Sequence, residues 1–260
     1  MKINDLTHPD NLTSPEVLSS PLRRTLTISG GNKGGTGKSL VATAVASLLM
    51  RRGESVTVIE ADPTNPDLAR RFANHAPVIL SDIADRDGWI ALLEALESIE
   101  TRHIVISLPA GMNEIESIGS LLSRTLDSLQ IDLNYLFALS RQHDSVELIG
   151  RSLEGGLGTF AQRGLAIKNG FFGRDEQFDR WHQSPHRQRW LAKPGYAETY
   201  LPELNFRLVD FLESNPQPLH CLEKAGLTTA LRFDLIDWLN AAKLCLQPIL
   251  PDITTAEGAV

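Results

Sequence analysis

The chain has 260 residues, of which 42% are hydrophobic and 22% are charged, and its formal net charge at pH 7 is -7. This composition can supply the core of a single α/β domain, and the negative balance argues against a chain built as a whole to bind DNA or anionic lipid. Cys221 and Cys245 are too few and too far apart for a disulfide framework or a metal knuckle, and the absence of a long apolar run or signal-peptide pattern makes us expect a cytoplasmic protein.

The N-terminal part of the chain passes from an irregular segment into a strand, a loop and a helix. Residues 1–24 are rich in Pro, Ser, Thr, Asn and Asp and show no sustained period, so we expect a flexible arm there. The apolar run 25–29 predicts a strand and the glycine-rich stretch 30–39 predicts a loop. Residues 40–49 predict a helix, because their apolar side chains fall on one helical face.

The rest of the chain continues this alternation. Further strands are predicted at 55–60, 103–108, 133–140 and 164–170, and further helices at 89–99 and 233–246. Near-continuous apolar strands separated by helices are typical of a parallel sheet that is covered on both faces. We therefore expect one α/β domain over 25–247, with a mainly parallel, doubly wound sheet flanked by helices, and a flexible tail over 248–260.

The loop GGNKGGTGKS, residues 30–39, fits a phosphate-binding loop in which Asn32 replaces the usual first glycine. Its glycines let consecutive backbone N–H groups approach phosphate oxygens, because a Cβ would block both the dihedrals and the approach. We expect Lys38 to bind the β- and γ-phosphates and Ser39 to supply a hydroxyl group to Mg²⁺, at the positive end of the following helix. The expected nucleotide contacts are Gly34, Gly35, Thr36, Gly37, Lys38, Ser39 and Leu40.

The run KGGTGKS, residues 33–39, resembles the deviant Walker A signature of the ParA/MinD family of ATPases, in which a lysine precedes the glycine pair. The resemblance implies a P-loop NTPase that uses ATP and Mg²⁺. It also implies that Lys33 reaches across a nucleotide-sandwiched homodimer to the phosphates of the other subunit, in the place of an arginine finger. Lys33 and Lys38 are therefore candidate catalytic residues. The alternative for Lys33 is a solvated lysine at the start of the loop.

Two later segments extend the resemblance. VTVIEADPTNPDL, residues 56–68, resembles the family's second acidic element, with Glu60 and Asp62 in its two acidic positions. The resemblance implies that Asp62 positions the attacking water, and the alternative is an Asp-Pro turn that ends a strand. HIVISLPAG resembles the Walker B strand, but Ser107 stands in the aspartate position. Because a neutral hydroxyl group cannot hold the water shell of Mg²⁺ as a carboxylate does, either Glu60 and Asp62 complete a metal site with Ser39 or hydrolysis is weakened.

The C-terminal half carries a weaker resemblance. In LAIKNGFFG, Asn169 follows a late strand at a place where the family often has an asparagine near the adenine, which implies a base contact; the alternative is a turn-forming Asn-Gly pair. Residues 171–189 have no counterpart across the general family. Together with YLPELNFRLVDFL they resemble ParA-like proteins encoded on plasmids beside partition or mobilisation genes.

Three functions fit these observations. The first is an ATP-dependent dimerising switch of ParA/MinD type that acts in plasmid partition, stability or conjugative transfer, or in positioning a cellular cargo, with a protein partner that stimulates hydrolysis. The second is a nucleotide-sensing scaffold with weak or no hydrolysis, which Ser107 suggests. The third is a small-molecule transferase or ligase of the dethiobiotin-synthetase type, which would not need Lys33.

The charge distribution bears on further partners. The C-terminal tail is neutral to acidic, so membrane docking through it is not expected. Non-specific DNA binding stays open through Arg151, Arg163, Arg174, Arg180, Arg187 and Arg189.

Overall fold

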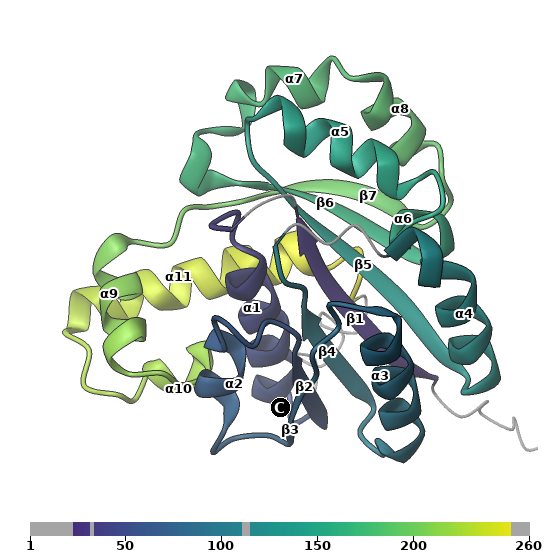
Figure 1. The fold of residues 1–260 in the computed structure, drawn as a ribbon. Helices are drawn as coiled ribbons and strands as arrows, with labels where there is room; N and C mark the ends of the chain where they lie inside the picture. Colours follow the sequence, from purple (N-terminus) through teal and green to yellow (C-terminus); the bar gives the residue numbers. More distant parts are fainter. Residues whose placement is uncertain (1–22, 32–33, 111–114, 251–260) are drawn as a thin grey trace, which may run out of the picture.

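A parallel sheet lies at the centre of the molecule. The computed structural model describes residues 23–31, 34–110 and 115–250, and within these ranges seven strands form the sheet in the order β3-β2-β4-β1-β5-β6-β7 (Figure 1). The strands are β1 (Arg24–Gly31), β2 (Val56–Glu60), β3 (Val78–Leu80), β4 (His103–Ser107), β5 (Ile131–Leu139), β6 (Arg163–Asn169) and β7 (Tyr196–Leu201). Every neighbouring pair is parallel. The expected α/β fold with a doubly wound parallel sheet is confirmed.

Helices cover both faces of this sheet (Figure 1). One face is covered by α3 (Arg86–Ser98), α4 (Ile115–Ser128), α5 (His143–Ser152), α6 (Leu157–Phe160), α7 (Asp179–His182) and α8 (Pro185–Leu191). The other face is covered by α1 (Lys38–Arg51), α2 (Asp67–Phe72), α9 (Phe206–Ser214), α10 (Leu219–Leu222) and α11 (Thr229–Leu246). Two short 3₁₀ helices, η1 (Gly170–Phe172) and η2 (Asp175–Gln177), follow β6.

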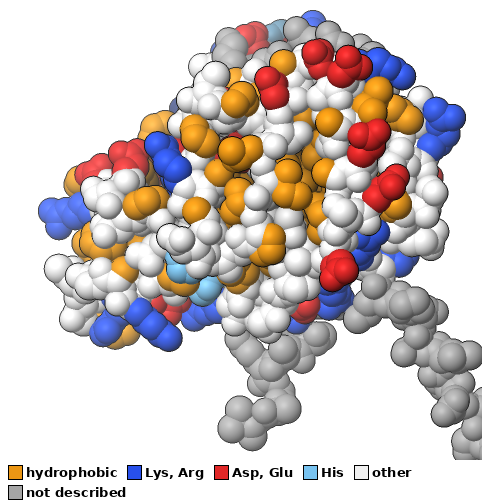
Figure 2. Space-filling model, turned by 60° about the horizontal axis from the view of Figure 1, so that its bottom comes forward, with side chains coloured by type: hydrophobic (Ala, Val, Ile, Leu, Met, Phe, Trp, Pro, Cys, Tyr) orange, Lys and Arg blue, Asp and Glu red, His pale blue; other side chains and the backbone are white. Residues whose placement is uncertain are grey.

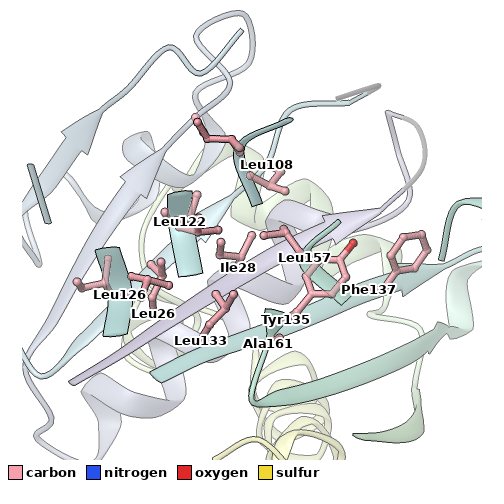
Figure 3. Packing of buried hydrophobic residues seen from close by; sticks show 14 of the residues in the cluster. Leu26, Ile28, Leu108, Leu122, Leu126, Leu133, Tyr135, Phe137, Leu157 and Ala161 are labelled. Atoms are coloured by element: carbon pink, nitrogen blue, oxygen red, sulfur yellow. The ribbon is translucent and has the colours of Figure 1, made fainter. Parts of the chain in front are cut away.

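The core is divided by the sheet into two apolar clusters, because successive residues of a strand point to opposite faces. In β4, Ile104 and Ile106 pack on the side of α3 and α4, whereas Val105 packs on the side of α1. Figure 3 shows the first cluster, where Leu26 and Ile28 of β1 lie beside Leu122 of α4. Strands that are buried on both faces read as continuous apolar runs, which is why the sequence predicted them.

The strands and the domain boundary predicted from the sequence agree only in part with those of the structure. The five predicted strands agree with β1, β2, β4, β5 and β6 to within two residues at each end. The sequence did not predict β3, which has 3 residues, or β7, whose middle positions are half-buried and include the polar residues Glu198 and Thr199. At the C-terminus, Ile249 and Leu250 are buried in the second apolar cluster, so the packed chain continues to Leu250, beyond the boundary expected at residue 247.

An ion-pair network fastens the β6–β7 connection to the sheet. Both carboxylate oxygens of Glu198, in β7, accept hydrogen bonds of 2.8 Å from the guanidinium group of Arg187, and Trp181 Nε1 donates a further bond of 2.8 Å. Lys168 of β6, which is 4% exposed, pairs with Asp175 at 2.5 Å and lies 3.8 Å from Glu198. Burial alone would raise the pKa of Glu198, but Arg187, Trp181 and Lys168 together hold it below its ordinary value.

Replacing Glu198 with glutamine should lower the free energy of unfolding by about 2 kcal/mol at neutral pH, because Arg187 and Lys168 lose their shared carboxylate. The lowered pKa means that this stabilisation is present above the ordinary carboxyl pKa and is lost as the pH falls through the folded-state value. Urea denaturation of both proteins, at neutral pH and below about pH 4, measures the difference.

The matched control is Glu154→Gln. Glu154 pairs with Arg189 at 2.8 Å, but both side chains are about half exposed, so we expect a loss below about 0.5 kcal/mol. An equal effect of Glu198→Gln at neutral and acid pH would show that the carboxylate charge is not what stabilises the β6–β7 connection.

Candidate functional site

The predicted loop lies at the carboxyl edge of the sheet, at its centre. Because all strands are parallel, their carboxyl ends meet at one edge, and β1 lies there between β4 and β5. The chain leaves β1 through α1 on one face and later reaches β5 through α4 on the other (Figure 1). Ligands of open α/β sheets bind outside the carboxyl ends of strands at such a change of direction. The topology therefore places the segment between β1 and α1 where a ligand is expected.

The glycines of this loop have the conformations and the space that an anion needs. Gly35 and Gly37 have φ angles of 79° and 95°, in the left-handed region that favours glycine. A Cβ added to Gly34 or Gly35 would meet nothing within 4 Å, so the backbone here is open to a ligand. Gly37 caps the first turn of α1, whose positive end lies at the loop. Asn32 and Lys33 lie outside the described residues.

Lys38, the first residue of α1, is 7% exposed. Burial lowers the pKa of its ammonium group, and the charge of Asp62 partly opposes this effect. Its backbone carbonyl accepts a hydrogen bond of 2.9 Å from the hydroxyl group of Ser29 at the end of β1, which fixes the start of the helix. A buried cation beside an open glycine loop suits a polyphosphate. Thr36 is buried, and Ser39 and Leu40 are half-buried.

Two serine hydroxyl groups face each other where a magnesium ligand set was expected. Ser39 Oγ lies 3.3 Å from Ser107 Oγ at the end of β4. Ser107 is paired in register with Ser29 of β1 and with Glu60 of β2. The described residues contain no group of three or more His, Cys, Asp and Glu side chains arranged to hold a metal ion alone. A divalent cation bound here would therefore take ligands from the phosphate and water in addition to Ser39.

Glu60 is 2% exposed and holds the following loop in place. Its Oε1 accepts a hydrogen bond of 3.1 Å from the N–H of Asp62, and its Oε2 accepts bonds of 2.9 and 3.3 Å from the N–H groups of Leu68 and Ala69. Burial raises the pKa of Glu60, and these hydrogen bonds partly offset that effect. The carboxylate thus connects β2 to the first turn of α2. Any role as a metal ligand would have to coexist with these bonds.

Asp62 forms the Asp-Pro turn that was one of the two roles expected from the sequence. Its charge also affects Lys38 in the candidate phosphate site. Its Oδ1 accepts hydrogen bonds from the N–H and hydroxyl groups of Thr64, at 3.1 and 2.6 Å, and from the N–H of Asn65 at 3.2 Å. The charge of Asp62 raises the pKa of Lys38 against the larger effect of burial. The turn lies just beyond the carboxyl end of β2, at the same edge of the sheet as the start of α1.

Asn169, at the end of β6, contacts the glycine loop. Its Nδ2 donates a hydrogen bond of 2.9 Å to the carbonyl oxygen of Thr36, and its Oδ1 accepts one of 3.1 Å from the N–H of Phe171. The side chain is 5% exposed. The structure thus places the amide nitrogen of Asn169 on the backbone of the loop, a contact that the sequence did not predict. The bond from Phe171 forms the turn that was the alternative to a base contact.

A groove beside this edge was not predicted from the sequence. It has a volume of about 340 Å³ and is lined by Glu203, Asn205, Phe206, Asp234 and Trp238. The backbone of Glu203 packs against Gly170, where an added Cβ would meet Glu203 N at 2.6 Å. Glu203, one of the residues that line the groove, thus lies beside the residue that follows Asn169. The signal for this groove in the sequence was the group of polar residues that follows β7, a strand that was not predicted.

Arg163, Arg180, Arg187 and Arg189, four of the arginines considered for DNA binding, make side-chain contacts within the chain. Arg187 and Arg189 are paired with Glu198 and Glu154. The guanidinium group of Arg163 donates a hydrogen bond of 3.2 Å to the carbonyl oxygen of Ile249. On the face shown in Figure 2, Lys and Arg side chains lie mainly around the margin, interspersed with Asp and Glu. Within the chain, carboxylates balance the positive charges of Arg187 and Arg189.

Both cysteines are free thiols. Of the helices in the described ranges, none combines the length and the hydropathy that crossing a lipid bilayer requires.

A parallel α/β sheet with a glycine loop between β1 and α1, a buried lysine at the helix start and serine hydroxyl groups beside it defines a P-loop nucleotide-binding protein. Residues 28–168 match the family model described as the CobQ/CobB/MinD/ParA nucleotide binding domain. The chain belongs to this family.

The chain is also similar to individual proteins. The chain is 30% identical over 230 residues to Protein MobD of Acidithiobacillus ferrooxidans, covering 88% of this chain and 99% of that protein. It is 24% identical over 136 residues to an uncharacterized ATP-binding protein of Methanocaldococcus jannaschii, covering 52% of this chain and 46% of the relative. It is also similar to a chain in the MinC:MinD cell division protein complex of Aquifex aeolicus, with 16% identity, a TM-score of 0.49 and coverage of 84% of this chain and 95% of that chain.

Proposed function

We propose that this protein is an ATP-dependent dimerising switch ATPase of ParA/MinD type. The observation that carries the proposal is the buried ammonium group of Lys38 at the start of α1, directly beside glycines that are open to a ligand. Membership of a nucleotide-binding family and similarity to Protein MobD over nearly the whole of that relative support it. The resemblance of the C-terminal half to plasmid-encoded members favours a role in plasmid partition, stability or transfer, with a protein partner that stimulates hydrolysis.

The nucleotide would lie across the carboxyl edge of the sheet. Backbone N–H groups of Gly34, Gly35 and Gly37 would hold the phosphates together with the ammonium group of Lys38. The hydroxyl group of Ser39 would be the protein ligand of Mg²⁺, an ion that supplies charge neutralisation at the β- and γ-phosphates when it is bound. The remaining contacts proposed for the nucleotide are Thr36 and Leu40, and Asn169 is proposed to act at the same site.

The base would reach toward the groove. Gly170, which follows Asn169, packs against the backbone of Glu203, and Phe206, which also lines the groove, is 67% exposed. An exposed aromatic ring at the edge of a groove is suited to stacking on a purine base. We therefore propose that Glu203 and Phe206 lie near the base.

The hydrolytic step would use residues from two protomers. Asp62, whose charge acts on Lys38, is the proposed residue that orients the attacking water. Glu60 holds the N–H of Asp62 and thereby positions the loop that carries it. Lys33 of the opposite protomer is proposed to supply positive charge to the phosphates as charge develops in the transition state. ATP would favour the closed dimer because its phosphates bind Lys33 only in that state.

ATP-dependent formation of a dimer is the property that tests this proposal. Replacing Lys33 with alanine should abolish ATP-dependent dimers while nucleotide binding to the monomer weakens by less than about threefold, because the side chain acts on the opposite protomer. Analytical ultracentrifugation with and without ATP measures the mass, and fluorescence titration measures monomer affinity.

The matched control is Lys224→Ala, which should leave dimerisation unchanged. This lysine is exposed, and its neighbour Glu223 pairs with Arg51 at the end of α1 opposite to the glycine loop. Dimers that form equally well with Lys33→Ala would contradict the role of Lys33. A wild-type protein that stays monomeric at saturating ATP would contradict the switch itself.

A second function, a nucleotide-sensing scaffold with weak hydrolysis, is favoured by one observation. Ser107, which is paired in register with Glu60 and Ser29, has a hydroxyl group and no carboxylate. This hydroxyl group faces that of Ser39. Steady ATP turnover that disappears in Asp62→Ala would support the switch, whereas nucleotide binding without turnover would support the scaffold. The two functions share the same nucleotide site.

A further inference from the structure

We infer that Asn169 is a positioning residue for the phosphate loop, which it sets through the carbonyl oxygen of Thr36. In this role it governs binding of the triphosphate rather than recognition of the base. The inference rests on the proposed function in one respect, namely that the loop holds the phosphates of a nucleotide.

The hydrogen bond from Asn169 fixes the orientation of one peptide plane in the loop. Asn169 Nδ2 donates to Thr36 O at 2.9 Å, across a sequence separation of 133 residues. In a trans peptide, the C=O of one residue and the N–H of the next point in opposite directions. Holding the carbonyl group of Thr36 toward β6 therefore turns the N–H of Gly37 away from β6. A phosphate-binding donor of the loop is thus oriented by a side chain from another strand.

The close approach of the two segments requires glycine at position 37. A Cβ built there would lie 2.4 Å from Asn169 Nδ2, and the φ angle of Gly37 is 95°. The same glycine therefore provides both the left-handed backbone and the space that the amide group occupies. The side-chain amide of Asn169 therefore packs directly against the loop backbone at Gly37.

Asn169 itself is held firmly enough to act as an anchor. Its Oδ1 accepts a hydrogen bond of 3.1 Å from Phe171 N, which fixes the side-chain amide from the other end. Its backbone lies in β6, in register with Leu201 of β7. The preceding residue, Lys168, is buried and paired with Asp175 at 2.5 Å. With the amide bonded at both ends, a reorientation of the peptide between Thr36 and Gly37 would break a buried hydrogen bond.

Inorganic tripolyphosphate separates this role from a base contact, because it has phosphates and no base. We expect Asn169→Ala and Asn169→Asp to weaken binding of ATP and of tripolyphosphate by the same factor, about tenfold, which is the loss of one buried hydrogen bond. Asn169→Asp keeps the acceptor for Phe171 N and loses the donor to Thr36 O. Asn169→Ala removes the bond without adding charge near the phosphates. Isothermal titration calorimetry gives both affinities.

The matched control is Asn134→Ala in β5. Asn134 is 1% exposed, and its Nδ2 donates a hydrogen bond of 3.3 Å to Thr27 Oγ1, away from the loop. This variant should lose thermal stability comparable to that of Asn169→Ala and bind both ligands as the wild type does. A general structural role of buried asparagine would instead affect ligand binding in both positions.

Each remaining result has a definite meaning. Loss of ATP binding with unchanged tripolyphosphate binding would overturn the inference and make Asn169 a base contact, leaving the proposed function intact. Weakening by Asn169→Asp alone would assign the effect to charge and would overturn it as well, as would unchanged binding in both variants. A wild-type protein that binds neither ligand would instead refute the proposed function on which the inference rests.

Discussion

Lys38→Met is expected to weaken ATP binding by about 100-fold while leaving the folded protein as stable as before or more stable. A buried ammonium group bonded to phosphate oxygens makes charge-assisted hydrogen bonds, and these contribute up to about 3 kcal/mol. Without nucleotide, the same ammonium group is buried at a cost, as its lowered pKa indicates. Methionine keeps most of the side-chain volume and removes that cost. Calorimetric titration and urea denaturation measure the two quantities separately.

Lys38→Arg provides the comparison for Lys38→Met. It keeps the positive charge but replaces a compact ammonium group with a wide planar guanidinium group inside a buried site, so we expect an intermediate loss of affinity. A Lys38→Met protein whose ATP affinity stays within about twofold of the wild type would show that the nucleotide does not use this loop.

Ser107→Asp is expected to raise Mg²⁺-dependent ATP turnover by about 10- to 100-fold. The hydroxyl group of Ser107 lies 3.3 Å from that of Ser39, so a carboxylate at position 107 would be placed to hold a water ligand of the ion that Ser39 is proposed to bind. Position 107 is 2% exposed, and a carboxylate there without a cation should lower the free energy of unfolding. Adding Mg²⁺ and ATP should therefore raise the melting temperature of the variant more than that of the wild type.

The control for this gain is Ser107→Asn, which adds an amide group of similar size without charge. It should reproduce any steric effect and none of the increase in turnover. If Ser107→Asp folds and binds ATP but turns over no faster, the serine does not limit metal-assisted hydrolysis.

Local signals explain why the loop and its flanking elements could be predicted. Gly35 and Gly37 adopt positive φ angles that other residues rarely accept, and β1 and α1 have apolar patterns of the matching period. The position of Lys38 follows directly from its neighbours in the sequence.

Contacts between distant segments explain what could not be predicted. Nothing near Asn169 indicates that its amide nitrogen bonds to Thr36, because that contact depends on the strand order that places β6 beside β5 and β5 beside β1. The strand β7 was missed because Glu198 interrupts its apolar pattern, and this carboxylate is accommodated by Arg187 from α8. Such polar positions resemble loop residues until their partners are known.

The carboxylate of Glu60 couples two segments that follow β2, namely the loop that carries Asp62 and the helix α2. It binds the backbone of Asp62 and also the first turn of α2, at Leu68. Releasing either part would leave the buried carboxylate with fewer donors, so moving α2 alone would cost a buried hydrogen bond. We therefore expect a displacement of α2 to shift the backbone of Asp62 as well.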